Sequence, residues 1–299
     1  MTTPYALVIG ESLVDVIPGA TGPVAHPGGS PLNLAVGLAR LGRPTKLATW
    51  FGRDAYGQAI KGHLAASGVK VLAGSDRASH TSSAQVVLDG AGSASYVFDI
   101  ETGLPELASE ANPLLVHTGS LGAMIAPAAG RVQQALRELK RGGAVISYDP
   151  NIRPVMGARD AVAALAESYV RLAHVVKVSD EDLAWLYPGA DPLGVAKQWA
   201  TIGPLLVVVT MGAKGAQGLS GQVRVAVGPP AGPVVDTVGA GDAFMAGLLH
   251  ALWGWLGAPG VLKETELRRA LEVATAAAGI DLGRPGADPP WAGELKLPD

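Results

Sequence analysis

Five short apolar runs constrain the fold of this 299-residue chain most strongly, because stretches with helical periodicity separate them along the sequence. Each run is apolar at successive positions, which is typical of a strand that is buried on both faces. Such strands in alternation with helices predict a mainly parallel sheet that is flanked by helices. The runs lie at residues 6–9, 114–116, 144–146, 175–176 and 205–209, and the helical stretches lie near residues 31–41, 55–67, 125–141, 158–173, 192–201, 239–255 and 263–279.

Two segments, at about residues 12–25 and 69–98, interrupt this rhythm with the pattern of β-hairpins, and turns are expected at 89–90 and 92–93. We predict a single α/β domain over residues 1–299, into which these segments are inserted as a small antiparallel β lid. Parallel sheets bind ligands beyond the carboxyl ends of their strands, so the site is expected there, under the lid.

Composition excludes several classes of function. Hydrophobic residues make up 48% of the chain and charged residues 16%, so a sizeable core is available. The net charge is −3 and Lys and Arg do not cluster, which argues against nucleic acid as a partner. The absence of cysteine excludes disulfides, thiolate metal sites and a cysteine nucleophile, and it agrees with a cytoplasmic protein.

Two apolar segments need to be distinguished from targeting or membrane segments. Residues 1–10 lack a basic region, so we interpret them as a first strand and not as a signal peptide. Residues 243–262 contain no Asp, Glu, Lys or Arg, but glycines and a proline interrupt them. A buried helix is therefore predicted there in place of a membrane span, and no membrane partner is expected.

The segment 236–242, Asp-Thr-Val-Gly-Ala-Gly-Asp, leads directly into the most apolar of the predicted helices. The first turn of a helix has unpaired N–H groups and a partial positive charge, and glycine there lets an anion approach the backbone. A carboxylate at Asp242 suits the base that deprotonates an attacking hydroxyl during phosphoryl transfer. The alternative is an acidic residue that the helix dipole favours, and this segment alone leaves both interpretations open.

Polar residues near the amino terminus also have two interpretations. Asp15 is a carboxylate between apolar neighbours, so it needs a hydroxyl or N–H partner from a ligand or from the protein. Residues 27–33 begin a helix with Ser30 as the expected N-cap and Pro31 as the first helical residue. The glycines before them leave the backbone open to a ligand.

Three later segments follow apolar strands. The loop at 148–154 places an acid, an amide and a cation together, which either a ligand or a proline turn explains. Ser179 and Asp182 fit a capping box at the start of the next helix. Residues 210–215 are expected either to line a nucleotide or to turn into a hairpin near 220–221.

Several common motifs are absent. The chain has no Walker motif and no dinucleotide fingerprint, so a nucleotide would be held in another way. It also lacks the Gly-x-Ser-x-Gly elbow of serine hydrolases, and its six histidines show no metal-ligand spacing.

Taken together and in order, these segments resemble the ribokinase-like (PfkB) carbohydrate kinases over nearly the whole chain, and the fructokinases most of all. Residues 28–35 are similar to the N-terminal signature of that family, and residues 236–242 are similar to its C-terminal signature. Residues 149–153 resemble the Asp-Pro-Asn-Leu-Arg motif of fructokinases. The resemblance implies a ribokinase-like fold and ATP-dependent phosphorylation of the primary hydroxyl of a sugar.

The resemblance also implies roles for individual residues. Asp242 is the implied base, and the N–H groups of Gly239, Ala240 and Gly241 form the implied anion hole. The residues implied to bind the sugar are Asp15, Gly28, Gly29, Asn33 and Arg153, although Arg153 is also placed to face the phosphates. The residues expected around the nucleotide are Ser179, Thr210, Gly212, Gly215 and Thr275.

Two cations follow from the same resemblance. Mg²⁺ would arrive with ATP and be held largely through waters, with Asp182 as the expected protein contact. Some relatives bind a monovalent cation, and K⁺ is the candidate here, at Asp236, Val238 and Gly286. Asp182 departs from the glutamate that is usual in the family, which bears on how Mg²⁺ is ordered.

The identity of the sugar is argued from charge. Between Arg77 and Arg131 the chain has no Lys or Arg, so this part of the predicted lid carries neither residue. Because related kinases of 2-keto-3-deoxygluconate grip a carboxylate partly with a lid arginine, a neutral sugar, fructose first, is expected. Ser30 stands where ribokinases have a lysine, which argues against ribose.

Alternatives to a fructokinase remain at this stage. Within enzymes they are a kinase of 2-keto-3-deoxygluconate, followed by a ribokinase or nucleoside kinase. The alternative of another class is a sugar-sensing protein without turnover. Dimers through the lid sheets are common in the resembled family, so a homodimer is a candidate assembly.

Overall fold

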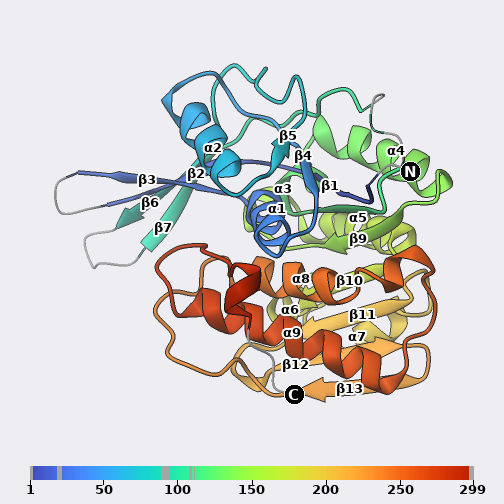
Figure 1. Ribbon diagram of the computed structural model, residues 1–299. Coiled ribbons are helices and arrows are strands. Elements are labelled where there is room, and N and C mark those ends of the chain that lie inside the picture. Colours follow the sequence, from blue (N-terminus) through green and yellow to red (C-terminus); the bar gives the residue numbers. More distant parts are fainter. Residues whose placement is uncertain (1–2, 19–21, 89–93, 108–109, 111, 296–299) are drawn as a thin grey trace.

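The computed structural model describes residues 3–18, 22–88, 94–107, 110 and 112–295. Its main element is a nine-stranded sheet in the order β13-β12-β11-β10-β9-β8-β1-β4-β5 (Figure 1). Neighbouring strands are parallel from β11 to β5, and β12 and β13 continue the sheet in antiparallel pairing. The strands are β1 (Ala6–Ile9), β4 (Thr45–Ala48), β5 (Lys70–Val71), β8 (Leu115–Gly119), β9 (Val145–Asp149), β10 (Val175–Ser179), β11 (Leu206–Thr210), β12 (Ala216–Ser220) and β13 (Val223–Val227).

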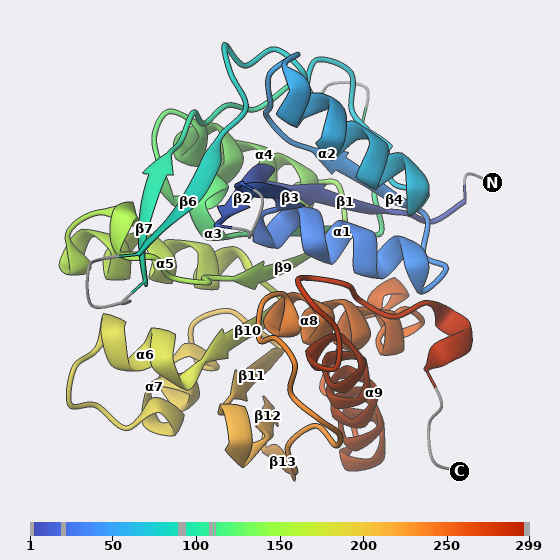
Figure 2. The same ribbon diagram turned by 90° about the vertical axis from the view of Figure 1, so that its left-hand side faces the viewer.

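Helices pack on both faces of this sheet, as the apolar strands predict (Figure 2). Alternate residues of each strand serve the two faces, so Val8 belongs to one core cluster while Leu7 and Ile9 belong to the other. One cluster includes buried residues of α1 (Ser30–Arg40), α2 (Ala55–Ala66), α8 (Ala240–Ala251) and α9 (Glu264–Leu282). The other includes residues of α3 (Ser120–Met124), α4 (Ala128–Arg141), α5 (Arg159–Leu172), α6 (Asp180–Leu186) and α7 (Pro192–Trp199).

A second, four-stranded sheet has the order β3-β2-β6-β7 and extends from the body of the molecule (Figure 1). Its outer pairs are antiparallel, whereas the central pair of β2 and β6 is parallel. It corresponds to the predicted lid, and the turns predicted at 89–90 and 92–93 lie outside the described residues. The strands are β2 (Leu13–Ile17), β3 (Val24–Gly28), β6 (Ser83–Leu88) and β7 (Ala94–Asp99).

The structure confirms the mainly parallel sheet with its small additional sheet, and it corrects some boundaries. The lid segment expected at 69–98 begins too early, because β5 pairs in parallel with β4 inside the main sheet. The first lid strand of that segment is β6, which starts at Ser83. The helix expected to reach residue 255 ends at Ala251.

Within the described part of the chain, none of the helices combines the length and the apolar character that a membrane crossing requires. Residues 243–251 of the apolar segment 243–262 belong to α8, which lies between α1 and α9 in the core of the molecule (Figure 2). Its apolar side chains are buried by these neighbours.

Candidate active site

The carboxyl ends of the parallel strands meet at one edge of the main sheet. The register pairs Gly119 with Asp149 and Ser179 with Thr210, so β8, β9, β10 and β11 all end there. β1 ends at the same edge with Ile9, and the chain then enters lid strand β2. This edge is where a doubly covered parallel sheet places its ligands.

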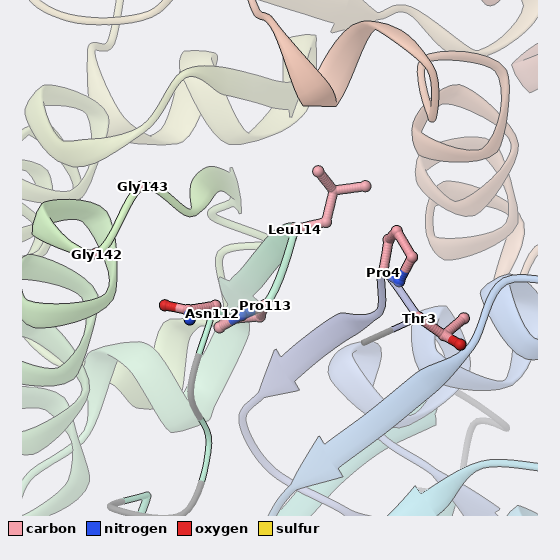
Figure 3. A pocket seen from close by; sticks show the side chains of 7 residues that line it. All are labelled: Thr3, Pro4, Asn112, Pro113, Leu114, Gly142 and Gly143. Carbon is pink, nitrogen blue, oxygen red and sulfur yellow. The ribbon is translucent and has the colours of Figure 1, made fainter. Parts of the chain in front are cut away.

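A pocket of about 250 Å³ lies at the opposite edge of the sheet (Figure 3). Its residues immediately precede β1, β8 and β9, and none of them has an ionisable side chain. The candidate active site is therefore the cluster of polar residues at the carboxyl ends of the strands. The pocket is lined by Thr3, Pro4, Asn112, Pro113, Leu114, Gly142 and Gly143.

The amino terminus of α8 forms the centre of this cluster. Gly239 precedes the helix in a left-handed conformation with φ of 86°, and a Cβ atom there would lie 2.5 Å from the Cβ of Ala287. The N–H of Ala240 reaches only a long hydrogen bond of 3.4 Å to the carbonyl of Thr237. The first turn thus presents backbone donors together with the positive end of the helix dipole, which is the composition of an anion site.

Asp242 lies in this first turn, and its side chain is buried. Ser30 Oγ donates to one carboxylate oxygen at 2.6 Å, and Asn33 Nδ2 donates to the other at 2.9 Å. Both donors belong to the first turn of α1, which packs against α8. The expectation that Ser30 caps α1 is wrong, because Gly29 occupies the N-cap and the hydroxyl of Ser30 turns to Asp242.

The electrostatics of Asp242 suit a base. Burial raises the pKa of Asp242 above its ordinary value, while the donors Ser30 and Asn33 and the charges of Lys177 and Arg153 oppose this rise. A carboxylate with a raised pKa is a stronger base than one in water. Its two hydrogen bonds also fix its orientation, as general-base catalysis requires.

Sequence reasoning missed a buried ion pair beneath this turn. Lys177 Nζ donates to Asp149 Oδ2 at 2.7 Å and reaches the carbonyl oxygen of Gly241 at 3.4 Å. Asp149 ends β9 and belongs to the predicted polar loop at 148–154, whereas Lys177 lies in β10, before the capping box of Ser179 and Asp182. Its one sequence signal is a charged residue inside an otherwise apolar strand.

The lid side of the site contains Asp15, Gly28 and Gly29. The Asp15 carboxylate lies against Gly28, where an added Cβ atom would overlap it. Burial raises the pKa of Asp15 to about 6, and the charges of His26 and Arg153 oppose that rise. Since Arg153 also acts on the pKa of Asp242, its guanidinium is in electrostatic reach of both carboxylates.

Glu11 is a second residue that sequence reasoning missed. It is buried at the end of β1 and accepts a hydrogen bond from the N–H of Gly122 at 2.7 Å. A Cβ atom added to Gly29 would lie 3.1 Å from the backbone carbonyl oxygen of Glu11. Glu11 therefore also packs closely against the glycine that precedes α1. Burial raises the pKa of Glu11, while bonds from Gly122 and Ser120 oppose the rise. Glu11 thus joins α3 to the start of α1.

Three of the residues predicted around the nucleotide lie at the end of β11. Thr210 ends that strand, and Gly212 and Gly215 flank a short 3₁₀ turn with φ of 52° and 86°. A Cβ atom on Gly215 would also overlap the backbone of Val227 and Gly228, so the fold itself requires a glycine at this position. The hairpin that was the alternative at 220–221 is present as β12 and β13.

Thr275 and Ser179 differ in the hydrogen bonding of their hydroxyl groups. The Thr275 hydroxyl on α9 is buried and has no hydrogen-bond partner among the described residues. Ser179 Oγ accepts from the N–H of Asp182 at 2.9 Å, which confirms the capping box. Asp182 in turn accepts from the N–H of Ile152 at 2.9 Å, so it anchors the loop that carries Arg153.

The loops predicted to bind a monovalent cation lie together. Asp236 accepts from the N–H of Val238 at 3.0 Å and from the N–H of Gly286 at 2.9 Å. Asp281 lies beside them, fully buried, and its Oδ2 atom has no hydrogen-bond partner in the described part of the chain. Over the same residues, no group of three or more His, Cys, Asp or Glu side chains is arranged to hold a metal ion.

The fold and the site define the class of this protein, an α/β phosphotransferase that acts on a hydroxyl group. The sequence matches the pfkB family carbohydrate kinase over residues 4–292. The chain therefore belongs to this family of carbohydrate kinases.

Individual relatives agree with this assignment. A fructokinase of Klebsiella pneumoniae is 36% identical over 263 residues, which are 82% of this chain and 83% of that protein. The crystal structure of a fructokinase from Xylella fastidiosa with bound ATP superposes with a TM-score of 0.80 at 25% identity, covering 97% of this chain and 94% of that one.

A fructokinase of Vibrio cholerae O395 with fructose, ADP and calcium has a TM-score of 0.78 at 27% identity and covers 95% of this chain and 94% of that one. A double mutant of that enzyme was solved with fructose, ADP and a potassium ion. These proteins are similar to this chain in both sequence and fold.

Proposed function

We propose that this protein transfers the terminal phosphoryl group of ATP to the primary hydroxyl of a small neutral sugar, and that the sugar is fructose. The observation that carries the proposal is the buried Asp242 carboxylate in the first turn of α8, held by Ser30 and Asn33. The relatives named fructokinase, one of them solved with fructose and ADP, support the choice of sugar.

Asp242 takes the proton from the sugar hydroxyl as that oxygen attacks phosphorus. The carboxylate must be ionised to do so, and its raised pKa makes it a better proton acceptor at neutral pH. The N–H groups of Gly239, Ala240 and Gly241, together with the dipole of α8, stabilise the charge that develops on the transferring group. Because the base and the anion hole belong to the same helix turn, their positions relative to each other are fixed.

The sugar is held from the lid side. Asp15 and the amide of Asn33 offer acceptors and a donor for sugar hydroxyls, and Gly28 and Gly29 let the ring approach the backbone. Arg153 is exposed and is the cation in reach of Asp15 and Asp242. An anionic substrate such as 2-keto-3-deoxygluconate would depend on this arginine, because the lid strands β2, β3, β6 and β7 contain no Lys or Arg.

ATP lies across the end of β11 in this proposal, along Thr210, Gly212 and Gly215. The unpartnered hydroxyl of Thr275 is a group that a ligand can satisfy. Mg²⁺ arrives with the phosphates and keeps most of its waters, which fits described residues that form no dedicated metal cage. Asp182 is already bonded to the backbone, yet carboxylate oxygens have further lone pairs that accept from a metal-bound water.

The loops around Asp236 and Gly286 fit a monovalent cation. A buried carboxylate oxygen without a partner is unfavourable unless a cation or a proton neutralises it, and Asp281 Oδ2 is such an atom beside these loops. Potassium bound to the Vibrio cholerae enzyme makes K⁺ the ion of choice. K⁺ would offset the negative charge next to the anion hole.

Two further features remain predictions. The lid sheet ends in β3 on one side and in β7 on the other, and strand edges of this kind favour pairing, so a homodimer through the lids is proposed. A cytoplasmic location is also proposed, and the absence of cysteine agrees with it.

The test is ADP release from Mg-ATP with fructose, ribose, 2-keto-3-deoxygluconate, glucose and adenosine in turn. We expect fructose to give the highest kcat/KM, and Asp242→Asn to lower kcat by at least about 100-fold while ADP binding is kept. The matched control is Asp160→Asn, since the Asp160 side chain is 95% exposed on the surface helix α5.

Each outcome is decisive. Turnover with another sugar of the panel would replace fructose by that sugar. Normal turnover of Asp242→Asn would overturn the mechanism. ATP binding without turnover on any sugar would favour the sensing protein.

A further inference from the structure

Lys177 is a buried ammonium group that the mechanism above does not use. It lies within β10, between valines that are themselves fully buried, and its side chain is only 6% exposed. Removing a charge from water is costly, and a buried ion pair often stabilises a fold no better than apolar residues of the same volume. The position of this pair beneath the anion hole therefore calls for a functional explanation.

The contacts of Lys177 lead to the catalytic turn. Its Nζ atom bonds Asp149 Oδ2 at 2.7 Å and approaches the carbonyl oxygen of Gly241 at 3.4 Å. A Cβ atom on Gly241 would meet this nitrogen at 3.0 Å, so the glycine leaves the ammonium room beneath the turn. The Gly241–Asp242 peptide contains this carbonyl oxygen and the N–H of Asp242. Lys177 therefore contacts the peptide that leads directly to the base.

The ionisable groups that face Lys177 come from four elements: Asp149 on β9, Asp182 on α6, Asp242 on α8 and His117 on β8. Burial and the charge of Lys177 lower the pKa of His117 to about 3, so this histidine is neutral. Burial disfavours the ammonium of Lys177, but Asp149 and the other carboxylates outweigh it and raise the pKa of Lys177. Lys177 is thus a permanent cation among three carboxylates.

Asp149 is the fixed counter-charge of this lysine. Its Oδ1 atom is buried and has no hydrogen-bond partner among the described residues, so the lysine is the polar group that holds this carboxylate. Burial raises the pKa of Asp149 to about 6 even though Lys177 opposes it, and Asp242 adds to the rise. Asp149, Lys177 and Asp242 therefore form one electrostatic unit across three elements.

We propose that Lys177 is a positioning residue for phosphoryl transfer: its ammonium, bonded to Asp149 at 2.7 Å and 3.4 Å from the Gly241 carbonyl oxygen, holds the Gly241–Asp242 peptide that follows the anion hole and places a positive charge near the base. Asp149 holds the ammonium in this position, and its negative charge partly offsets the effect of the ammonium on Asp242. The role deepens the proposed kinase function and rests on it.

The inference predicts opposite effects for the two partners. Loss of the cation in Lys177→Met raises the pKa of Asp242, so the acid limb of the kcat profile moves to higher pH. Loss of the anion in Asp149→Asn leaves the lysine unopposed, so the same limb moves to lower pH. An ion pair that exerts no electrostatic influence on Asp242 gives no shifts of opposite sign.

Stability is separated from catalysis by a double variant. Lys177→Met alone strands a buried carboxylate and is expected to lower Tm, whereas Lys177→Met with Asp149→Asn removes both charges and restores Tm. We expect the single and the double variant to lose about 10- to 100-fold in kcat with a smaller change in KM, and Lys177→Arg to recover part of it. A double variant with both wild-type Tm and wild-type kcat would overturn the proposal.

A readout without turnover separates this inference from the proposed function. Carboxyl-¹³C-labelled aspartate gives an NMR resonance for Asp242 that is identified by its loss in Asp242→Asn. Its titration should shift up in Lys177→Met and down in Asp149→Asn, even if no sugar of the panel is phosphorylated. Titration that is unchanged in both variants would reject the role of Lys177.

Discussion

Two helices begin with a glycine of positive φ at the same edge of the sheet, and they contribute different chemistry to the site. Gly239 precedes α8 and Gly29 precedes α1, with φ of 86° and 107°. The first turn of α8 carries the acid Asp242, whereas the first turn of α1 carries no acid but supplies the two donors that hold it. One helix start thus provides charge and dipole, while the other provides orientation.

The largest expected difference between the two starts comes from their glycines. An added Cβ atom on Gly239 would lie 2.5 Å from the Cβ and 2.7 Å from the Cα of Ala287, whereas on Gly29 the nearest atom is the carbonyl oxygen of Glu11 at 3.1 Å. Both substitutions are strained, but only Gly239→Ala forces the anion hole to move. We expect kcat to fall by about 100-fold in Gly239→Ala, and by about 10-fold or less in Gly29→Ala with a rise in the KM of the sugar.

Steady-state kinetics measure this difference, and Gly62→Ala is the matched control. Gly62 lies in the exposed part of α2 with open space around it, so alanine there should keep kcat and leave Tm equal or higher. Equal losses of kcat at Gly239 and Gly29 would show that the two helix starts are not specialised.

A smaller effect is expected from the donors on α1. Ser30→Ala and Asn33→Ala each remove a hydrogen bond that favours the ionised form of Asp242, so the pKa of Asp242 rises further. The carboxylate is then ionised only at higher pH, and the acid limb of the kcat profile moves upward. At pH 7 we expect losses of about 3- to 10-fold, the range of one or two hydrogen bonds.

The pH–rate profile measures this shift. Thr201→Ala serves as the control, because its hydroxyl donates to the nearby Gln198 carbonyl on the surface. An acid limb that stays in place in both α1 variants would mean that Ser30 and Asn33 hold the helix and not the base.

The smallest expected effect is on thermal stability, and it concerns Asp281 near the start of α8. Burial raises the pKa of Asp281 to about 7, with added repulsion from Asp242 and Asp288. The folded state thus favours the protonated form, which adds stability below the ordinary aspartate pKa of about 4, and this contribution is lost as the pH rises through about 7. Asp281→Asn stays neutral, so at pH 8 in potassium-free buffer we expect its Tm to exceed that of the wild type by about 3 °C or more.

Differential scanning calorimetry at pH 5 and pH 8 checks this prediction. The gap between the variant and the wild type should shrink at pH 5, where the carboxyl group is protonated. KCl at pH 8 should raise the wild-type Tm more than that of the variant. A Tm of Asp281→Asn below that of the wild type at pH 8 without potassium contradicts the argument.

Much of the fold was predictable because the signals are local. The apolar runs predicted five parallel strands, β1, β8, β9, β10 and β11, to within a few residues, but they missed the inner strand β4; glycine before an apolar stretch predicted the start of α8. β5 was missed because its two residues are one exposed and one half-buried, so they carry no apolar run. Only its pairing with β4 places it in the main sheet.

The site was predictable in part for the same reason. The sequence predicted roles for Asp242 at the start of a helix, for Asp15 within a strand and for the loops that hold Arg153 and Asp236. It did not predict that Ser30 bonds Asp242 across 212 positions of the chain, because capping was a sufficient local explanation for that serine. Glu11 and Lys177 gave no local signal beyond a charge next to or within an apolar strand.

By itself, the sequence determined the alternation of strands and helices, the glycine-rich start of α8 and the acid that follows it, because periodicity and helix-start chemistry depend on neighbouring residues. Only the tertiary structure decided that α1 meets α8 with its donors and that Lys177 lies between Asp149 and Gly241. Those contacts join distant positions, and their energies depend on burial and on the distances that packing alone sets.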